Sequence, residues 1–271
     1  MSFKTDGSSH HNGISGEKII LDQVRNNPAL QTYLGGIETA SHLGGTANKA
    51  DIQFRRRTGQ VIGISVKTRS SSSGTFDWVN SSSLIQSMPG LSSIKEYCDG
   101  VQGIHADTTL SRKEGKESIK ICRAAITLRV TEALTTLSTD SARLRQVLQL
   151  GLSKYLEASE FYISLYYKKE RRSEWFEFKT GHLIVPLLQD PSASFYLKGS
   201  KGSRVIWCAL SDGSHYNTMI RLRVHLNNGV GALIAGKKWS SNAYSALVVK
   251  LQQDTPEKLL EQIKDTQTFM L

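Results

Sequence analysis

Apolar and polar residues alternate in two neighbouring runs near the start of the chain, over residues 51–55 and again over residues 61–67. Successive side chains of a β-strand point to opposite faces, so each run has one apolar face and one polar face. The polar segment 55–60, with Gly59 near its end, is short enough to turn the chain back. The pattern therefore predicts a β-hairpin.

The polar face of this hairpin carries Asp51, Ser65 and Lys67. A carboxylate beside an ammonium suits phosphodiester hydrolysis, because Asp binds a hard cation such as magnesium through oxygen while substrate phosphate fills other positions. Lys67 would orient or deprotonate the attacking water, and the sequence leaves both roles open. The hairpin is thus a candidate metal-dependent nuclease site.

An apolar-periodic segment over residues 14–34, with Ser15 as a candidate helix cap, precedes the hairpin. Glycine pairs at 35–36 and 44–45 then bracket a short apolar run at residues 37–42. The predicted order is therefore helix, strand, strand, strand.

In these residues the chain resembles the PD-(D/E)xK nuclease superfamily, which includes type II restriction endonucleases and related phage and homing endonucleases. The motif of that family is an Asp, a hairpin-length spacer, then an acidic residue, any residue and Lys. The match here is Asp51, thirteen intervening residues and Ser65-Val66-Lys67. The family often adds a Glu from the first core helix, and Glu17 is in the expected order. The resemblance covers roughly residues 14–80.

This resemblance implies an α/β fold with a mixed central β-sheet flanked by helices, as in a restriction-endonuclease-like core. It implies catalytic roles for Asp51, Lys67, Glu17 and Ser65. It also implies that Asp51 and Glu17 hold Mg²⁺, for which Mn²⁺ could substitute. The expected activity is hydrolysis of DNA by a sequence-specific, metal-dependent endonuclease.

The chain departs from the family at Ser65, where the usual residue is Asp or Glu, so one direct carboxylate ligand is missing. Glu17 is the first candidate to compensate, with Glu38 or Asp77 as alternatives. A second hypothesis is a non-catalytic DNA-binding protein with a decayed nuclease-like site. A third keeps the chemistry but acts on RNA or on branched DNA.

Composition supports a polyanionic partner, since 34 Lys and Arg against 24 Asp and Glu give a net charge of +10. Ribosomal and membrane-surface proteins share such a balance, so the charge does not choose among partners. The sequence contains no Walker A loop and no dinucleotide-binding glycine fingerprint, which argues against ATPases and dehydrogenases. Double-stranded DNA is the partner that the motif favours.

In the second half of the chain, a helical apolar stripe at residues 141–160 precedes an apolar run at 161–167. A basic turn at 168–172 and an aromatic run at 175–178 then predict a second hairpin. Residues 219–225 alternate as another strand. A Thr-Pro pair within residues 254–257 predicts a capped C-terminal helix.

Basic residues at these turns and strand faces are the candidate DNA contacts, because Arg binds guanine through two donors and Lys neutralises phosphate. Solvated turns and an ordinary exposed sheet face are the alternatives. The candidates are Arg55, Arg69, Lys168, Lys169, Arg171, Arg172, Arg221, Arg223, Lys237 and Lys238.

The predicted organisation is a flexible N-terminus (residues 1–13), a nuclease core (14–160) and a β-rich DNA-recognition region with a C-terminal helix (161–271), unless the last two form one continuous domain. No run approaches the roughly 20 apolar residues that cross a bilayer, and the polar start lacks a secretory signal. We therefore expect no membrane partner and a cytoplasmic location in a bacterial or phage-infected cell. Symmetric cutting would require a homodimer or sequential nicking.

Overall fold

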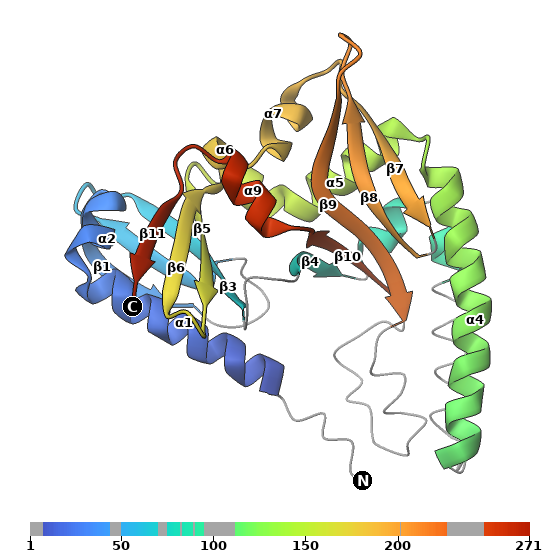
Figure 1. Cartoon of the computed structure of the whole chain (residues 1–271), viewed down its shortest axis with the longest axis horizontal. Helices are drawn as coiled ribbons and strands as arrows, with labels where there is room; N and C mark the ends of the chain where they lie inside the picture. The colour runs from blue at the N-terminus through green and yellow to red at the C-terminus, as the bar shows by residue number, and fades with distance from the viewer. Residues whose placement is uncertain are drawn as a thin grey trace. The chain divides into compact units, whose positions relative to one another are not determined.

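The computed structural model (Figure 1) describes residues 8–43, 50–69, 75–81, 83–88, 90–94, 112–200, 202–226 and 247–271. These residues form a mixed α/β structure with a six-stranded mixed sheet and a five-stranded antiparallel sheet, flanked by helices. None of the described helices is both long and apolar enough to cross a membrane.

The chain divides into two compact units that are interleaved along the sequence. Unit 1 comprises Met1–Gly74, Ser153–Val185 and Thr255–Leu271, and unit 2 comprises Thr75–Leu152 and Pro186–Asp254. The predicted boundary between residues 160 and 161 falls inside unit 1, because the strand that follows it returns to the first sheet.

The sheet of unit 1 has the strand order β1-β2-β3-β5-β6-β11. Its strands are β1 (Ile37–His42), β2 (Ile52–Arg56), β3 (Val61–Arg69), β5 (Phe161–Tyr167), β6 (Arg172–Glu177) and β11 (Gln267–Met270). The pair β3 and β5 is parallel, and every other neighbouring pair is antiparallel. All seven residues of β5 are buried, as expected for a strand covered on both faces.

Two helices begin unit 1 where the sequence predicted one segment, α1 (Ser8–Asn26) and α2 (Pro28–Tyr33). The break occurs because Pro28 has no amide hydrogen and disfavours a helical conformation at the residue before it. Asn27 caps α2 by accepting hydrogen bonds from the amides of Ala29 and Leu30. Residues 1–7 lie outside the described residues, and α1 starts within the segment predicted to be a flexible terminus.

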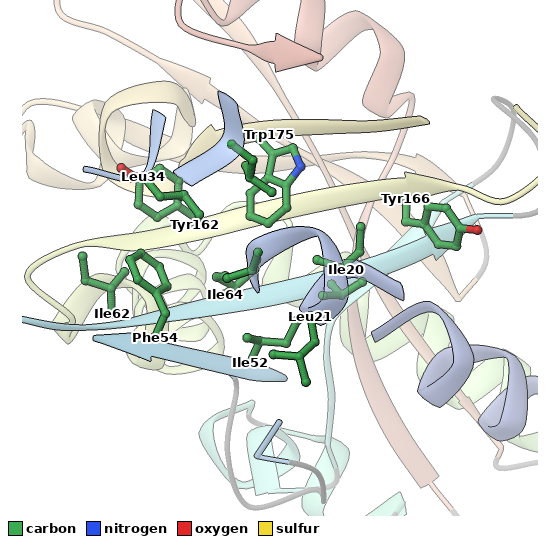
Figure 2. Close-up of a cluster of buried hydrophobic side chains, with 13 residues drawn as sticks. Ile20, Leu21, Leu34, Ile52, Phe54, Ile62, Ile64, Tyr162, Tyr166 and Trp175 are labelled. Carbon is green, nitrogen blue, oxygen red and sulfur yellow. The ribbon is translucent and has the colours of Figure 1, made fainter. Parts of the chain in front are cut away.

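The core of unit 1 lies between these helices and the sheet. Figure 2 shows Ile20 and Leu21 of α1 with Ile52 of β2 and Ile64 of β3. Tyr162 of β5 belongs to the same buried cluster. The alternating apolar residues that predicted the hairpin therefore form the face of the sheet that packs against α1 and α2.

Unit 1 also contains α6 (Phe178–Gly181) and α9 (Pro256–Gln262), and both α5 (Ser141–Glu157) and α7 (Ile184–Gln189) have residues in each unit. The predicted C-terminal helix is present as α9, but its cap differs from the prediction. Thr255 is the N-cap with φ of 44° and makes no side-chain capping hydrogen bond. A residue in this left-handed region cannot adopt the extended geometry of a normal N-cap.

The sheet of unit 2 has the order β4-β10-β9-β8-β7 and is antiparallel throughout. Its strands are β4 (Phe76–Ser81), β7 (Ser194–Ser200), β8 (Ser203–Ala209), β9 (His215–Leu226) and β10 (Leu247–Gln253). The unit also contains η1 (Ser83–Ser87) and α4 (Arg112–Leu137). Arg204 of β8 donates to the carbonyl oxygens of Leu134 and Thr131, so α4 covers the sheet face to which Arg204 points.

Candidate active site

Asp51 lies immediately before β2, where its backbone joins the hairpin. Its amide donates to the carbonyl of Ile64 at 2.8 Å, and its carbonyl accepts from the amide of Leu43 at 3.0 Å. The side chain is held as well, because Oδ2 accepts from the amide of Val66 at 2.6 Å and from the hydroxyl of Ser65 at 3.2 Å. Two neighbouring residues of β3 therefore fix the direction of this carboxyl group.

Burial raises the pKa of the Asp51 carboxyl above its ordinary value. The charge of Lys67 and the Val66 amide hydrogen bond oppose this increase, whereas the carboxylate of Glu17 adds to it. The structure thus brings Asp51, Ser65, Lys67 and Glu17 into one electrostatic group. Ser65 is 1% exposed and Lys67 lies two residues further along β3, on the same face.

Glu17 is positioned by the close approach of α1 to β3. A Cβ atom at Gly16 would lie 2.0 Å from Oγ1 of Thr68, so a larger residue at this turn of the helix would have to displace the Thr68 side chain. The neighbouring Glu17 accepts a hydrogen bond at Oε2 from Nε2 of His42, at 2.6 Å. The helix therefore places a second carboxylate near Asp51.

His42 was absent from the residues that the sequence singled out, although it is the last residue of the correctly predicted strand at 37–42. It lies opposite Ile52 in the antiparallel pair β1 and β2, and so beside the start of the hairpin. No local pattern links His42 to Glu17, because 25 residues separate them. Only the packing of α1 against β1 reveals their contact.

The donor set fits a magnesium ion in its chemistry. Among the residues that the structure describes, no three His, Cys, Asp or Glu side chains group together as a metal site. Magnesium does not need such a cage, because one or two carboxylates, water and substrate phosphate complete its coordination. Glu17 disfavours ionisation of Asp51. A divalent cation would offset that repulsion, so Asp51 and Glu17 are the residues that could hold it.

The two alternative carboxylates are placed differently. Glu38 is exposed on β1. Asp77 belongs to unit 2, where it accepts hydrogen bonds from Nζ of Lys250 and Nε2 of Gln252, both at 2.7 Å. Of the three candidates, Glu17 alone influences the pKa of Asp51.

The predicted DNA contacts in unit 1 fall into exposed and occupied residues. Arg55 on β2 is exposed, as are three residues of the turn between β5 and β6, which are Lys168, Lys169 and Arg171. Arg172 pairs with Glu170 and Glu174, and its guanidinium lies 4.0 Å from the ring centroid of Tyr167. The exposed turn is therefore the basic surface of this hairpin.

Arg69 is 6% exposed and pairs with Glu257 of α9 at 3.0 Å. Its guanidinium is directed into the protein, because α9 supplies a carboxylate from a distant part of the sequence. Arg69 is therefore removed from the set of DNA contacts.

The remaining candidates belong to unit 2. Arg221 of β9 pairs with Asp254 at 2.6 Å, and Arg223 is exposed two residues further along the strand. Lys237 and Lys238 lie outside the described residues.

Models of known protein families gave no match to this sequence, and curated proteins gave none either. The assignment of a function therefore depends on the chemistry of the site described above.

Proposed function

We propose that this protein is a magnesium-dependent endonuclease that hydrolyses phosphodiester bonds in DNA, with a preference for particular sequences. The observation that carries the proposal is the fixed carboxyl group of Asp51, held by Val66 and Ser65 and close to the charges of Lys67 and Glu17. Two partly buried carboxylates of like charge oppose each other's ionisation, so their placement beside an ammonium favours a site that takes up a cation.

The architecture of unit 1 supports the same proposal. A mixed sheet flanked by helices is the fold class that the resemblance to PD-(D/E)xK nucleases implies. The motif residues lie at the start of β2 and along β3, and α1 supplies the additional glutamate. A restriction-endonuclease-like core is therefore part of this proposal.

Each residue has a distinct role in the proposed reaction. Bound magnesium would supply charge stabilisation and a more acidic water, with Mn²⁺ as a substitute. Asp51 and Glu17 would hold the cation, and Ser65 would keep Asp51 in place by its hydrogen bond. Lys67 would orient the attacking water or stabilise the developing charge on the phosphate.

Cleavage of plasmid and phage DNA in magnesium or in EDTA tests the proposal. The variants are Asp51→Asn and Lys67→Met, with Asp22→Asn and Lys264→Met as controls on exposed positions of unit 1. We expect discrete fragments in magnesium alone, and a loss of rate on the order of 10²-fold or more in the two site variants only. Equal rates in site and control variants would contradict it.

A non-catalytic DNA-binding protein is the second candidate, and Ser65 is the observation that favours it. A neutral hydroxyl stands where the related motif has a carboxylate, so the site has one ligand fewer. DNA binding without cleavage in Mg²⁺ or in Mn²⁺ would support this candidate. Branched DNA and RNA substrates test the third possibility in the same assay.

Double-stranded cleavage raises the question of a homodimer, since one site cuts one strand at a time. Two copies related by a twofold axis would present two sites to a symmetric target. The solution mass of the DNA complex distinguishes a dimer from sequential nicking by one copy.

A further inference from the structure

In the part of unit 2 that the structure describes, one face of the sheet packs against α4 and the other face points away from it. Arg204 of β8 points toward α4 and contacts its backbone. Because side chains alternate along a strand, Ser203, Val205 and Trp207 point to the opposite face. The burial of β8 follows this alternation, with Arg204 buried and the three others partly exposed.

Aromatic and cationic side chains gather on that opposite face. The strand register places Tyr196 opposite Trp207, and Lys198 opposite Val205. In the next strands, Arg223 of β9 lies opposite Ser203 of β8 on one side and opposite Lys250 of β10 on the other. We call this set the aromatic–cationic face, and it consists of Tyr196, Lys198, Trp207, Arg221, Arg223 and Lys250.

Two aromatic rings of this face are partly open to solvent. Both Tyr196 and Trp207 are partly exposed, and the hydroxyl of Tyr196 lies 2.9 Å from Nδ1 of His215, which holds its ring in place. The ammonium of Lys198 lies 3.9 Å from the ring centroid of Trp207 and 5.4 Å from that of Tyr196. The side chain of an exposed lysine can move from a ring face to an anion and so leave the ring to a planar ligand.

The charge of the face is complementary to a phosphodiester chain. It has four cations against the two carboxylates that contact it, Asp77 and Asp254, which leaves an excess of two positive charges. Within the part of the chain that the structure describes, Lys198 and Arg223 have no carboxylate partner. Both are exposed.

We infer that the aromatic–cationic face binds a single-stranded segment of DNA, with bases stacked on Trp207 and Tyr196 and phosphates on Lys198 and Arg223. Stacking requires unpaired bases, because a duplex hides the faces of its bases, whereas every unpaired base offers one. The inference rests on the proposed function in taking DNA as the polyanion. It adds that the substrate contains an unpaired stretch.

The test measures anisotropy of a fluorescein-labelled mixed-sequence 15-nucleotide strand and of the same sequence as a duplex, in EDTA so that no cleavage occurs. The full chain is used, with Trp207→Leu, Trp207→Phe and Tyr196→Leu. The control is Tyr216→Leu, since Tyr216 is 44% exposed on β9 but lies opposite Cys208 rather than Trp207. Thermal unfolding identifies any variant that does not fold.

We expect the single strand to bind more tightly than the duplex, and Trp207→Leu to weaken its binding about tenfold. Trp207→Phe keeps a ring and should retain most of the affinity, and Tyr216→Leu should match the wild type. If Trp207→Leu does not fold, Tyr196→Leu carries the same expectation. Arg223→Gln should lower the slope of log affinity against log salt by about 0.7.

Tighter binding of the duplex, or equal affinity of the wild type and both leucine variants of the face for the single strand, would overturn the inference. Its outcome is separate from that of the nuclease proposal. Binding is measured in EDTA, so its result is obtained whether or not the wild type cuts DNA in magnesium. If the protein cleaves DNA and Trp207 contributes nothing to single-strand binding, the nuclease proposal stands and the inference of a single-stranded segment is rejected.

Discussion

The two units of this protein treat charge in opposite ways. Unit 1 places Asp51 inside a hairpin, fixes it by hydrogen bonds and raises its pKa by burial. Unit 2 places Lys198 and Arg223 at the surface, where solvent screens them. A fixed, poorly hydrated charge suits chemistry, whereas exposed and flexible cations suit recognition of a polyanion.

The contrast also separates what each unit can tolerate. Changes in the interior of unit 1 act on packing and on buried charge, so their effects on stability should be large. Changes on the open face of unit 2 should alter binding with little effect on stability.

A second carboxylate beside Asp51 should have the largest effect. Ser65→Asp restores an acidic residue of the related motif but buries a like charge, so we expect a loss on the order of 3 kcal/mol in the free energy of unfolding in EDTA. Magnesium should recover part of it, because a ligand of the folded state stabilises that state. Urea unfolding with and without magnesium measures both effects.

The control for Ser65→Asp is Ser211→Asp, an exposed position of unit 2, which should change stability by less than about 0.5 kcal/mol. Equal losses in the two variants would mean that position 65 is no more sensitive to charge than the surface. A loss that magnesium leaves unchanged would argue against a cation at Asp51.

The contact between α1 and β3 should give the next effect. Gly16→Ala puts a methyl group 2.0 Å from Oγ1 of Thr68, and we expect a net loss of about 1–2 kcal/mol after the gain in helix propensity. Thr68→Ala removes that oxygen, which has no hydrogen-bond partner among the described atoms, and should restore part of the stability in the double variant. Additive effects would show that the two residues are not coupled.

The pH dependence of stability should be smaller and should reveal Asp51 directly. Its pKa in the folded state is above the ordinary value of 3.8, so the folded protein retains this proton to higher pH than the unfolded chain does. Ionisation of Asp51 therefore lowers stability as the pH rises through that window. The thermal unfolding temperature of Asp51→Asn, relative to that of the wild type, should therefore increase when the pH is raised from 4 to 7 in EDTA.

Asp22→Asn on the exposed side of α1 is the matched control and should follow the wild type at both pH values. If Asp51→Asn instead loses stability relative to the wild type as the pH rises, the ionised carboxylate is stabilising. The expectation that ionisation of Asp51 destabilises the folded protein would then be wrong.

The smallest effect is expected at the exposed basic turn between β5 and β6. This turn is an exception to the contrast between the units, because it places exposed cations in unit 1. Arg171 has φ of 48°, a conformation that glycine adopts without steric strain. Arg171→Gly should raise stability by about 0.5 kcal/mol while weakening DNA binding. Lys169→Gly, without a positive φ, should weaken binding and lower stability instead.

Local patterns account for the parts of the fold that the sequence predicted. The strand at 37–42 and the first hairpin follow from alternation and glycines, and the structure has them at Ile37–His42, Ile52–Arg56 and Val61–Arg69. Asp51, Ser65 and Lys67 were predicted to share a surface because they lie on this one hairpin. The activity assigned to them stays a prediction.

Long-range contacts explain what the sequence did not provide. The burial of Arg69 depends on Glu257, and the contact of Glu17 with His42 depends on helix packing. The division into units follows from a parallel pair whose strands are far apart in the chain. The cluster of Tyr196 and Trp207 needs the register of two strands, which neither strand specifies alone.

The parallel pair of β3 and β5 also has a consequence for biosynthesis. Gly63 pairs with Phe161, so the partners are 98 positions apart in the sequence (161 − 63). Closing so long a loop is entropically unfavourable and slow compared with forming the first hairpin. On the ribosome, Asp51 and Lys67 would emerge long before β5, the strand that pairs with β3. The nascent chain should therefore leave one edge of β3 without its parallel neighbour until late in synthesis.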